Sequence, residues 1–395
     1  MWQPLPRTVV ALGIVSFFTD LSSEMIYPLL PAFLTTVLGA GAIALGVIEG
    51  VAESTAALVK VLSGLWADRQ RRRMPLIVAG YGLAGLVRPL IGLAAGWSFV
   101  LAMRFLDRIG KGLRTSPRDA LIADVTEPGQ RGAAYGFHRA MDHGGAVVGP
   151  LVAAGLLAFT SVSLRDVFLL AAIPAAVTML VLVLGVRERA VARPPGVRAA
   201  SFTGWRELGR DFRLVLLAVL VFTLGNSTDA FLLLRLSDAG LPAAWVAALW
   251  SSHHVVKMVS TYVGGRLSDV AGRRRLILVG WLVYAAVYLL FALVESSAGL
   301  IAVFLVYGLY FGLTEPSERA WVADLAPTHR RGAAFGYYHG AIGLGALPAS
   351  LLFGVLWHLA GAAVAFATGA ALASAAAGIL LLVPDRPRPA PRAAS

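Results

Sequence analysis

The stretch Arg131-Gly-Ala-Ala-Tyr-Gly136 recurs 200 residues later as Arg331-Gly-Ala-Ala-Phe-Gly336, and an Ala-Asp pair ending at Asp124 or Asp324 precedes each copy. A second stretch is also repeated. Gly64-Leu-Trp-Ala-Asp68 corresponds to Gly265-Arg-Leu-Ser-Asp269 at an offset of 201 residues, and arginines follow both copies. Patterns that recur in the same order predict two similar halves in the same orientation, related by an axis along a membrane normal.

Composition places these halves in a membrane. The chain has 395 residues, of which 58% are hydrophobic and 14% charged, whereas about 25% are charged in soluble domains. A membrane-spanning helix needs roughly 20 apolar residues, so about a dozen spans fit. Residues 169–184 and 361–383 are almost wholly apolar on every face, which excludes the alternating pattern of a transmembrane β-barrel. The predicted fold class is therefore an all-α polytopic membrane protein.

Apolar runs separated by polar residues predict twelve transmembrane helices in two six-helix, pseudo-symmetric bundles. They are expected at residues 8–37, 43–67, 75–96, 98–121, 132–159, 164–186, 211–236, 243–267, 276–296, 298–321, 332–357 and 361–383.

The loops between these segments indicate the orientation. Arginines follow the second, fourth, eighth and tenth segments, whereas the loops at 38–43 and 94–98 carry no charge. By the positive-inside rule, both termini are expected to be cytoplasmic in a bacterial inner (plasma) membrane. The N-terminal segment has no small-residue cleavage pattern, so we expect it to be retained as the first span rather than removed as a signal peptide.

Composition also predicts the domain boundaries. We expect an N-terminal six-helix bundle at 1–186 and a C-terminal bundle at 211–384. The intervening residues 187–210, rich in Arg and Pro, are expected to form a cytoplasmic linker. The Pro- and Arg-rich residues 385–395 are expected to form a disordered cytoplasmic tail.

Several classes of function are disfavoured. Without cysteine there is no disulfide, thiolate metal site or cysteine nucleophile. The net charge of +12 is explained by membrane topology, so we expect no nucleic-acid partner. The chain lacks a P-loop motif and a nucleophile–base constellation, and its seven histidines show no close ligand spacing. We therefore expect no enzymatic activity, no cofactor and no metal site. We further expect the protein to function as a monomer in the lipid bilayer.

The loop motifs resemble those of the major facilitator superfamily (MFS), and the resemblance covers residues 7–384. The family pattern G-x-x-x-D-x-x-G-R-[RK] is complete in the second half, at Gly265, Asp269, Gly272, Arg273 and Arg274. In the first half Gly64, Asp68, Arg72 and Arg73 fit, but Arg71 replaces the second glycine, which predicts a differently shaped turn. The resemblance implies a gating latch. The alternative is a simple positive-inside loop.

A second motif lies in the fourth predicted span. Arg104-Phe-Leu-Asp107-Arg108-Ile-Gly110 resembles the family pattern R-x-x-[QD]-x-x-G, and Lys111 follows it. Residues 104, 107, 108 and 111 share one helix face, and charges at the centre of a membrane helix cost roughly 2.5–3.5 kcal/mol each when they face lipid. This face is therefore expected to line the cavity or to form a self-neutralised structural cluster.

A third motif lies in the fifth span, where Gly136, Gly145, Gly149 and Pro150 resemble the G-x8-G-x3-G-P pattern of MFS antiporters, mainly drug exporters. Ala153 and Ala154 replace the usual closing glycines. The motif favours export. The alternative is ordinary packing of small residues.

Charged side chains inside the predicted spans are candidates for proton coupling and substrate contact. Asp20 and Glu24 share a face of the first span. Either they bind and release a proton, or they form structural ion pairs with Arg88, Arg104 or Arg108. Asp142 and Asp229 are further candidates, and all three lysines of the chain lie inside spans.

These features lead to three functional hypotheses. The leading one is a secondary transporter that exports a small molecule in exchange for protons, working by rocking of the two bundles. The alternatives are a proton-coupled importer of an organic anion or zwitterion, which the cationic stripe of the fourth span favours, and a membrane receptor or scaffold that does not transport.

Overall fold

The computed structural model describes residues 4–30, 33–40, 42–70, 72–188, 207–227, 229–241 and 243–384. Within these ranges every regular element is a helix, in agreement with the predicted fold class. Most of the expected linker, the whole expected tail and Arg71 lie outside the described residues.

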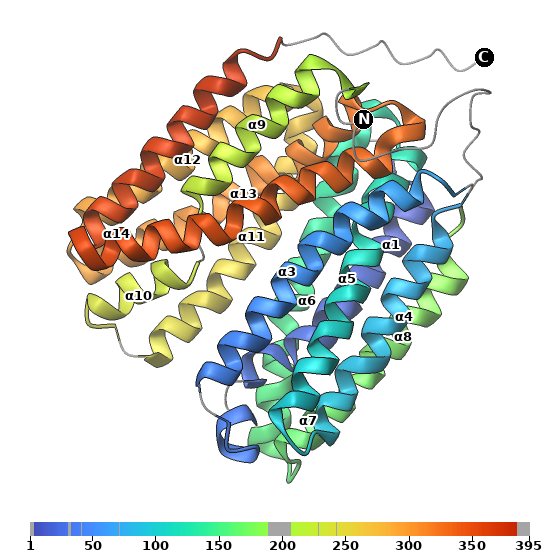
Figure 1. Ribbon diagram of the computed structural model, residues 1–395, viewed down its shortest axis with the longest axis vertical. Helices are drawn as coiled ribbons and strands as arrows, with labels where there is room; N and C mark the ends of the chain where they lie inside the picture. The colour runs from blue at the N-terminus through green and yellow to red at the C-terminus, as the bar shows by residue number, and fades with distance from the viewer. Residues whose placement is uncertain are drawn as a thin grey trace. The chain divides into compact units, whose positions relative to one another are not determined.

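The helices follow the predicted spans closely (Figure 1). The first half comprises α1 (Arg7–Glu24), η1 (Tyr27–Leu29), η2 (Phe33–Val37), α3 (Ala42–Ala67), α4 (Met74–Leu90), η3 (Ile91–Leu93), α5 (Trp97–Val125), η4 (Pro128–Gln130), α6 (Arg131–Phe159), α7 (Leu164–Leu170) and α8 (Ala172–Gly185). The second half comprises α9 (Gly209–Gly225), α10 (Ala230–Asp238), α11 (Ala243–Ala271), α12 (Arg273–Leu293), α13 (Ser297–Leu325), η6 (Thr328–Arg330) and α14 (Arg331–Leu381).

Three spans that were predicted to be continuous are interrupted. The first ends as α1 at Glu24 and continues through η1, which contains Pro28. The sixth divides at Ala171 into α7 and α8, and the seventh divides between Gly225 and Ala230 into α9 and α10. Conversely, α14 covers both of the last predicted spans, and Gly361 with a φ of 87° marks the kink between them. Only glycine adopts such a φ readily.

Length and apolarity alone identify seven of the described segments as able to cross a membrane: Arg7–Leu29, Met74–Leu93, Pro128–Phe159, Leu164–Gly185, Arg273–Leu293, Ser297–Leu325 and Thr328–Leu381. The last of them contains the kink at Gly361 and so provides two predicted spans. The helices outside this set include α5 and α11, which contain the charged and polar side chains described below.

The chain divides into two compact units. Unit 1 comprises Met1–Val125, Met141–Phe202 and His329–Gly340, and unit 2 comprises Thr126–Ala140, Thr203–Thr328 and Ala341–Ser395. The beginnings of α6 and α14 therefore pack with helices of the other sequence half. The domain boundaries expected from composition stay a prediction.

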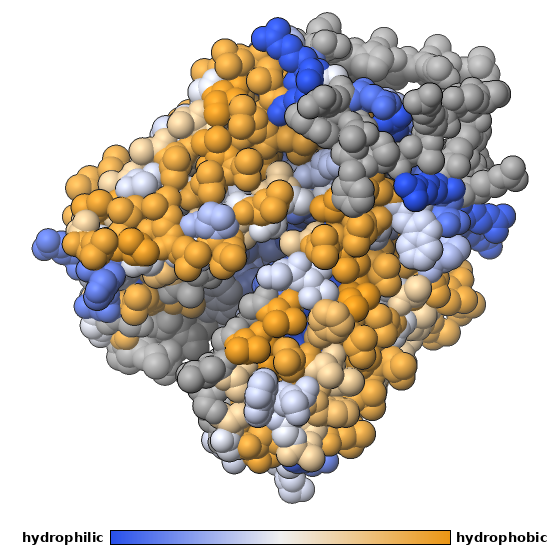
Figure 2. Space-filling view, in the orientation of Figure 1, coloured by the Kyte–Doolittle hydropathy of each residue, from blue (hydrophilic) through white to orange (hydrophobic). Residues whose placement is uncertain are grey.

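Each unit has its own packed interior. In unit 1, α3 and α4 lie beside α5, and α1 lies beside α8. In unit 2, α11 and α12 lie beside α13, and the fully buried aromatic side chains include Trp281, Tyr284, Tyr288 and Phe304. Apolar side chains also cover the outward face of α14 (Figure 2), where Leu344 and Leu359 are each 76% exposed. An exposed apolar surface of this kind suits a helix that borders lipid.

Candidate functional site

Asp269 lies near the C-terminal end of α11 and contacts the start of α6. Its carboxylate accepts hydrogen bonds from the backbone amides of Gly132 (3.0 Å) and Ala133 (2.7 Å). The helix backbones touch at Gly265, where an added Cβ would lie 2.3 Å from the Gly132 carbonyl oxygen. Gly272 has a φ of 98°, so the turn into α12 requires glycine. A carboxylate at a helix N-terminus is favourably placed, because the unpaired amides there carry partial positive charge.

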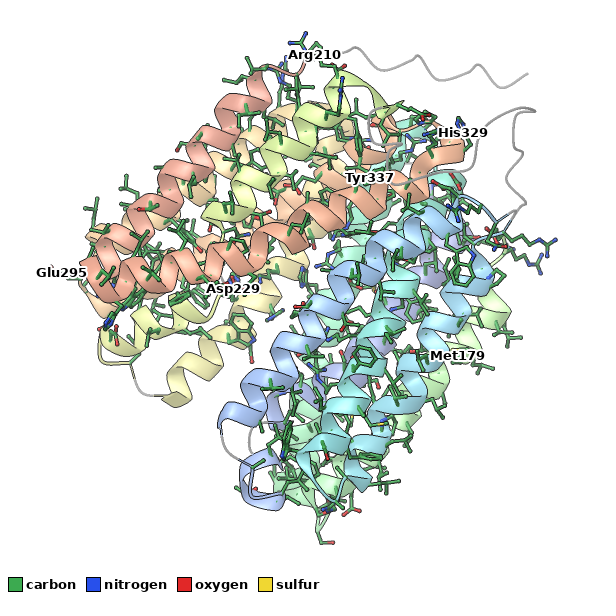
Figure 3. The ribbon with its side chains drawn as sticks, viewed as in Figure 1. Met179, Arg210, Asp229, Glu295, His329 and Tyr337 are labelled. Atoms are coloured by element: carbon green, nitrogen blue, oxygen red, sulfur yellow. The ribbon has the colours of Figure 1, made fainter. Side chains whose placement is uncertain are left out.

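Asp68 makes the same contact in unit 1. It accepts hydrogen bonds from the amides of Gly332 (2.9 Å) and Ala333 (2.7 Å) at the start of α14. An added Cβ on Gly64 would lie 2.3 Å from the Gly332 carbonyl oxygen. Tyr337, labelled in Figure 3, packs one turn further along α14 against the small apolar cluster that includes Leu65. Asp68 and Asp269 therefore make equivalent contacts with the first turn of a helix.

Of the two arginines that fit the motif after Asp68, Arg73 is the one that contacts the Asp68 carboxylate. Arg72 is exposed, and Arg73 is 2% exposed and lies 3.4 Å from Asp68. The corresponding arginine of the second half, Arg273, pairs with Asp269 four residues earlier. The first-half loop thus contains one more residue between the aspartate and its arginine, which shifts the buried position by one.

A second aspartate completes each cluster. Asp124 pairs with Arg73 and with Arg331, the latter at 2.6 Å. In unit 2, Asp324 pairs with Arg131 and with Arg273, the latter at 3.3 Å. Both repeats therefore build a four-member cluster of two aspartates and two arginines beside the first turn of a helix. The sequence marks these aspartates as part of the repeat, but nothing in the pattern indicates their partners.

The charged face of α5 is largely neutralised within unit 1. Asp107 is 2% exposed and accepts a 2.6 Å hydrogen bond from Arg88 Nε. Arg104 and Arg108 also lie near Asp107, at 3.7 and 3.9 Å. Arg108 further pairs at 3.5 Å with Glu53, whose side chain is 65% exposed. This arrangement fits the structural cluster better than an open cationic stripe.

Asp20 and Glu24 on α1 differ from Asp107. Among the residues that the structure describes, no side chain makes a direct ion pair or hydrogen bond with either carboxylate. Both are partly exposed, and the charge of Lys111 on α5 acts on both of them. Lys111 also acts on Glu53. The three groups Asp20, Glu24 and Lys111 therefore form a set of charges in unit 1 that are close but not bound to one another.

The glycines of the antiporter-like motif do not share one neighbour. An added Cβ on Gly145 would lie 2.3 Å from the Phe17 carbonyl oxygen, and one on Gly149 would lie 2.8 Å from the Leu21 carbonyl oxygen. These two glycines, with Pro150 beside them inside α6, thus face the helix that bears Asp20 and Glu24. Gly136 instead packs against α11 at Gly265, so the motif joins two different packing surfaces.

Further buried charges connect the repeats. Ser16 donates a hydrogen bond to Asp142. In unit 2, Arg139 makes two hydrogen bonds to Glu315, at 2.6 and 3.0 Å. In unit 1, His339 lies 2.9 Å from Asp119, which Arg118 also contacts at 2.9 Å. Apart from the adjacent Arg118 and Asp119, the members of these pairs are more than a hundred residues apart in sequence, which is why the sequence pattern did not reveal them.

The remaining candidates lie in unit 2. Asp229, labelled in Figure 3, lies in the interruption between α9 and α10, and its carboxylate contacts Lys257 on α11 and Tyr307 on α13. All three lysines lie on helices, Lys60 on α3, Lys111 on α5 and Lys257 on α11. In the described part of the chain, no group of three or more His, Asp or Glu side chains is placed to hold a metal ion.

Comparison with known proteins identifies the family. The family model described as Major Facilitator Superfamily matches residues 12–252 and 242–395. The chain belongs to this superfamily. It is 32% identical over 386 residues to an uncharacterized MFS-type transporter of Methanocaldococcus jannaschii, covering 96% of this chain and 95% of that protein. It is also 26% identical over 330 residues to the multidrug resistance protein MdtH of Sodalis glossinidius, covering 81% and 78% of the two chains.

Solved structures show the same fold. The E. coli fucose:proton symporter FucP matches with a TM-score of 0.80 at 15% identity, over 96% of this chain and 98% of that one. The human organic anion transporter MFSD10 matches with a TM-score of 0.77 at 17% identity, over 96% and 100%. This MFS protein is therefore a multi-pass membrane transporter for a small molecule and not an enzyme. The resemblance drawn from the loop motifs is confirmed.

Proposed function

We propose that this MFS transporter exports a small molecule in exchange for protons, and that Asp20 or Glu24 carries the proton. The supporting observation is the state of these two carboxylates. They lie on one helix within reach of the charge of Lys111, and they have no direct partner among the described residues. A carboxylate inside a membrane protein without a fixed counter-ion is well suited to binding and releasing a proton.

The competing role was structural pairing with an arginine. Arg88 and Arg104 both contact Asp107, and Arg108 contacts Asp107 and Glu53. The charges of all three arginines also act on Glu24, but their direct contacts are with Asp107 and Glu53, which supports a coupling role for the α1 carboxylates. We also propose that Lys111 and Asp142 in unit 1, and Asp229 in unit 2, are groups that meet substrate or proton.

Two further lines support export. Gly145 and Gly149 hold α6 against the backbone of α1 beside Asp20 and Glu24, so the antiporter-like motif touches the proposed proton carrier. The MdtH relative is named a multidrug resistance protein, a function that suits export. The fold does not decide the direction, because one solved relative is a symporter and another an organic anion transporter.

We also propose that Asp68 and Asp269 act as gating latches, that both termini are cytoplasmic in a bacterial inner membrane, and that a monomer is the functional form. The bundles at 1–186 and 211–384 would then rock about the cavity, with 187–210 as the linker. Energised inverted vesicles test the direction. Uptake of a solute into them supports export, and expulsion supports the importer.

The coupling role is tested in proteoliposomes with Asp20→Asn and Glu24→Gln. Exchange of labelled for unlabelled solute needs only the loaded transition, so it should persist in the variant that lacks the proton carrier, while accumulation driven by a pH gradient is lost. If exchange and expression are lost together, the carboxylates are structural. Full pH-driven activity in both variants would refute the assignment and move the proton site to Asp142.

A further inference from the structure

The seventh predicted span is interrupted in unit 2 by a short non-helical segment. Asn226 leaves the helical region with φ −98° and ψ 88°, and α10 begins at Ala230. Tyrosines of α12 satisfy the freed groups. The Tyr284 hydroxyl donates to the Gly225 carbonyl at 3.0 Å, and the Tyr288 and Ser227 hydroxyls are 3.1 Å apart. Non-helical backbone at membrane depth is tolerated where it is buried in protein or lines a binding cavity.

Asp229 lies at the end of this segment with two partners. One carboxylate oxygen accepts a 2.8 Å hydrogen bond from the Tyr307 hydroxyl. The other lies 3.4 Å from the ammonium nitrogen of Lys257, which is long for a charge-assisted hydrogen bond. The Asp229 side chain is 24% exposed, whereas that of Lys257 is 5% exposed. The pair is therefore loose, and its acidic member is accessible.

Two aromatic rings lie near the ammonium group of Lys257. Lys257 Nζ lies 3.7 Å from the centre of the Phe311 ring and 5.5 Å from that of Trp250. His253 is stacked almost parallel on Tyr307, with ring centres 5.2 Å apart. The His253 and Tyr307 side chains are fully buried, whereas those of Trp250 and Phe311 are partly exposed. The Trp250 and Phe311 rings are called here the aromatic wall. Such rings hold a cation by its attraction to the ring faces, and they also stack on a planar ligand.

The surrounding charges balance. Besides Asp229, the charges of Glu315 and Arg139 act on Lys257, and those two side chains are bound to each other. A lone anion on Lys257 would compete with Asp229, and a lone cation on Asp229 would be repelled by Lys257. A ligand with both charges inserts into the loose pair, so that each protein charge gains an opposite partner and the net charge is unchanged.

We infer that Asp229, Lys257 and the aromatic wall form a binding subsite for an aromatic zwitterion, whose carboxylate pairs with Lys257, whose ammonium pairs with Asp229 and whose ring stacks on the wall. The subsite lies wholly within unit 2, on α11, α13 and the α9–α10 segment. The inference rests on the proposed function only in taking this ligand to be the transported substrate.

The test measures binding to the purified full chain in nanodiscs, without any pH gradient. The probes are phenylalanine and tryptophan, the amine and the acid that lack one charge of each (phenethylamine, 3-phenylpropionate, tryptamine and 3-indolepropionate), and leucine as an aliphatic zwitterion. We expect at least one aromatic zwitterion to bind about tenfold or more tightly than its amine, its acid and leucine, since each of these lacks one anchor. Equal binding of the three charge types, tighter binding of the acid or the amine, or no binding of any probe would overturn the inference.

Variants identify the groups. Lys257→Gln and Asp229→Asn should each remove the preference for the zwitterion, and Phe311→Leu should remove the preference for an aromatic ring while keeping the charge preference. The conservative Phe311→Leu keeps the assignment testable when a charge variant fails to fold. Asp238→Asn is the control, because Asp238 is an exposed carboxylate at the end of α10. Unchanged selectivity in all three subsite variants would contradict the inference.

The proposed function can fail or stand independently of this subsite. Its failure is full pH-driven accumulation in Asp20→Asn and Glu24→Gln, which leaves the binding selectivity of unit 2 unaffected. If the wild-type protein shows no selectivity for zwitterions while the α1 variants lose coupling as proposed, the subsite alone is overturned.

Discussion

Asp68 and Asp269 are equivalent residues of the two repeats, and each accepts two hydrogen bonds from backbone amides at the start of a helix in the opposite repeat. The distances agree within 0.1 Å, with 2.9 and 2.7 Å for Asp68 and 3.0 and 2.7 Å for Asp269. Gly332 and Gly132 each donate one of these hydrogen bonds, and a Cβ on Gly332 would lie 2.6 Å from the Asp68 carboxylate. The bare glycine therefore makes the contact possible.

Removing either charge should slow transport. Asp68→Asn and Asp269→Asn each lose the attraction between a carboxylate and a helix N-terminus, so we expect turnover to fall about tenfold while the folded protein still reaches the membrane. Solute flux per unit of folded protein is the measurement. Glu127→Gln, at an exposed position, is the control, and wild-type flux in both aspartate variants would discard the gating role.

The neighbouring arginines provide a matched pair. Arg73 is buried against Asp68 and Asp124, whereas Arg72 is exposed. We therefore expect Arg73→Gln to impair folding or flux severely, because it leaves two carboxylates near a single arginine, and Arg72→Gln to behave like the wild type. Yield of monodisperse protein and flux are compared for both. Equal effects would mean that only the number of basic residues in the loop matters.

The contact between α6 and α1 should not tolerate a large side chain. A Cβ at Gly149 would lie 2.8 Å from a backbone oxygen and 2.9 Å from the Glu24 Cβ, so Gly149→Leu is expected to abolish transport by forcing the helices apart. Gly155 has no atom within 4 Å of an added Cβ, and Gly155→Leu should transport normally. A functional Gly149→Leu protein would show that the small-residue spacing has no role.

The cluster around Asp107 is expected to be structural. Asp107→Asn leaves Arg88, Arg104 and Arg108 without their shared carboxylate, which costs about 3–5 kcal/mol for a buried pair, so we expect a large loss of thermal stability. Replacing the pair together, as Arg88→Met with Asp107→Leu, should recover part of it, because Arg88 no longer stays buried without its carboxylate, whereas Arg104 and Arg108 still lose theirs. A melting temperature unaffected by Asp107→Asn is the contrary result.

The sequence predicts the fold well because each span has its own local signal. Apolar runs, arginine-rich loops and the 200-residue repeat predict the twelve segments and their pairing into halves. The sequence pattern does not predict the interruption between α9 and α10, because residues 226–229 include no proline or glycine, although their run of four polar residues, Asn, Ser, Thr and Asp, was a usable signal.

The contacts of the candidate site are harder to predict from the sequence than the helices are. The motif includes both Arg72 and Arg73 and predicts a differently shaped turn, but it does not indicate which arginine is buried, because burial depends on the path of the loop. The partners of Asp68, Asp124 and Asp119 come from residues 329–340, more than 200 positions away. Such pairings depend on how α14 packs, which no local pattern encodes.

The confinement of lysine to α3, α5 and α11 makes the protein suited to chemical footprinting. With three lysines in the whole chain and no cysteine, an amine-directed reagent has three side chains to modify, and peptide mass spectrometry distinguishes them. Lys257 is 5% exposed, so a solute that enters the Asp229–Lys257 pair would be detected as a change in its slow labelling, and protection of Lys111 would report occupancy beside Asp20 and Glu24. A single cysteine introduced at any other position provides a thiol label free of background, so both halves of the transporter can be followed in the otherwise unaltered chain.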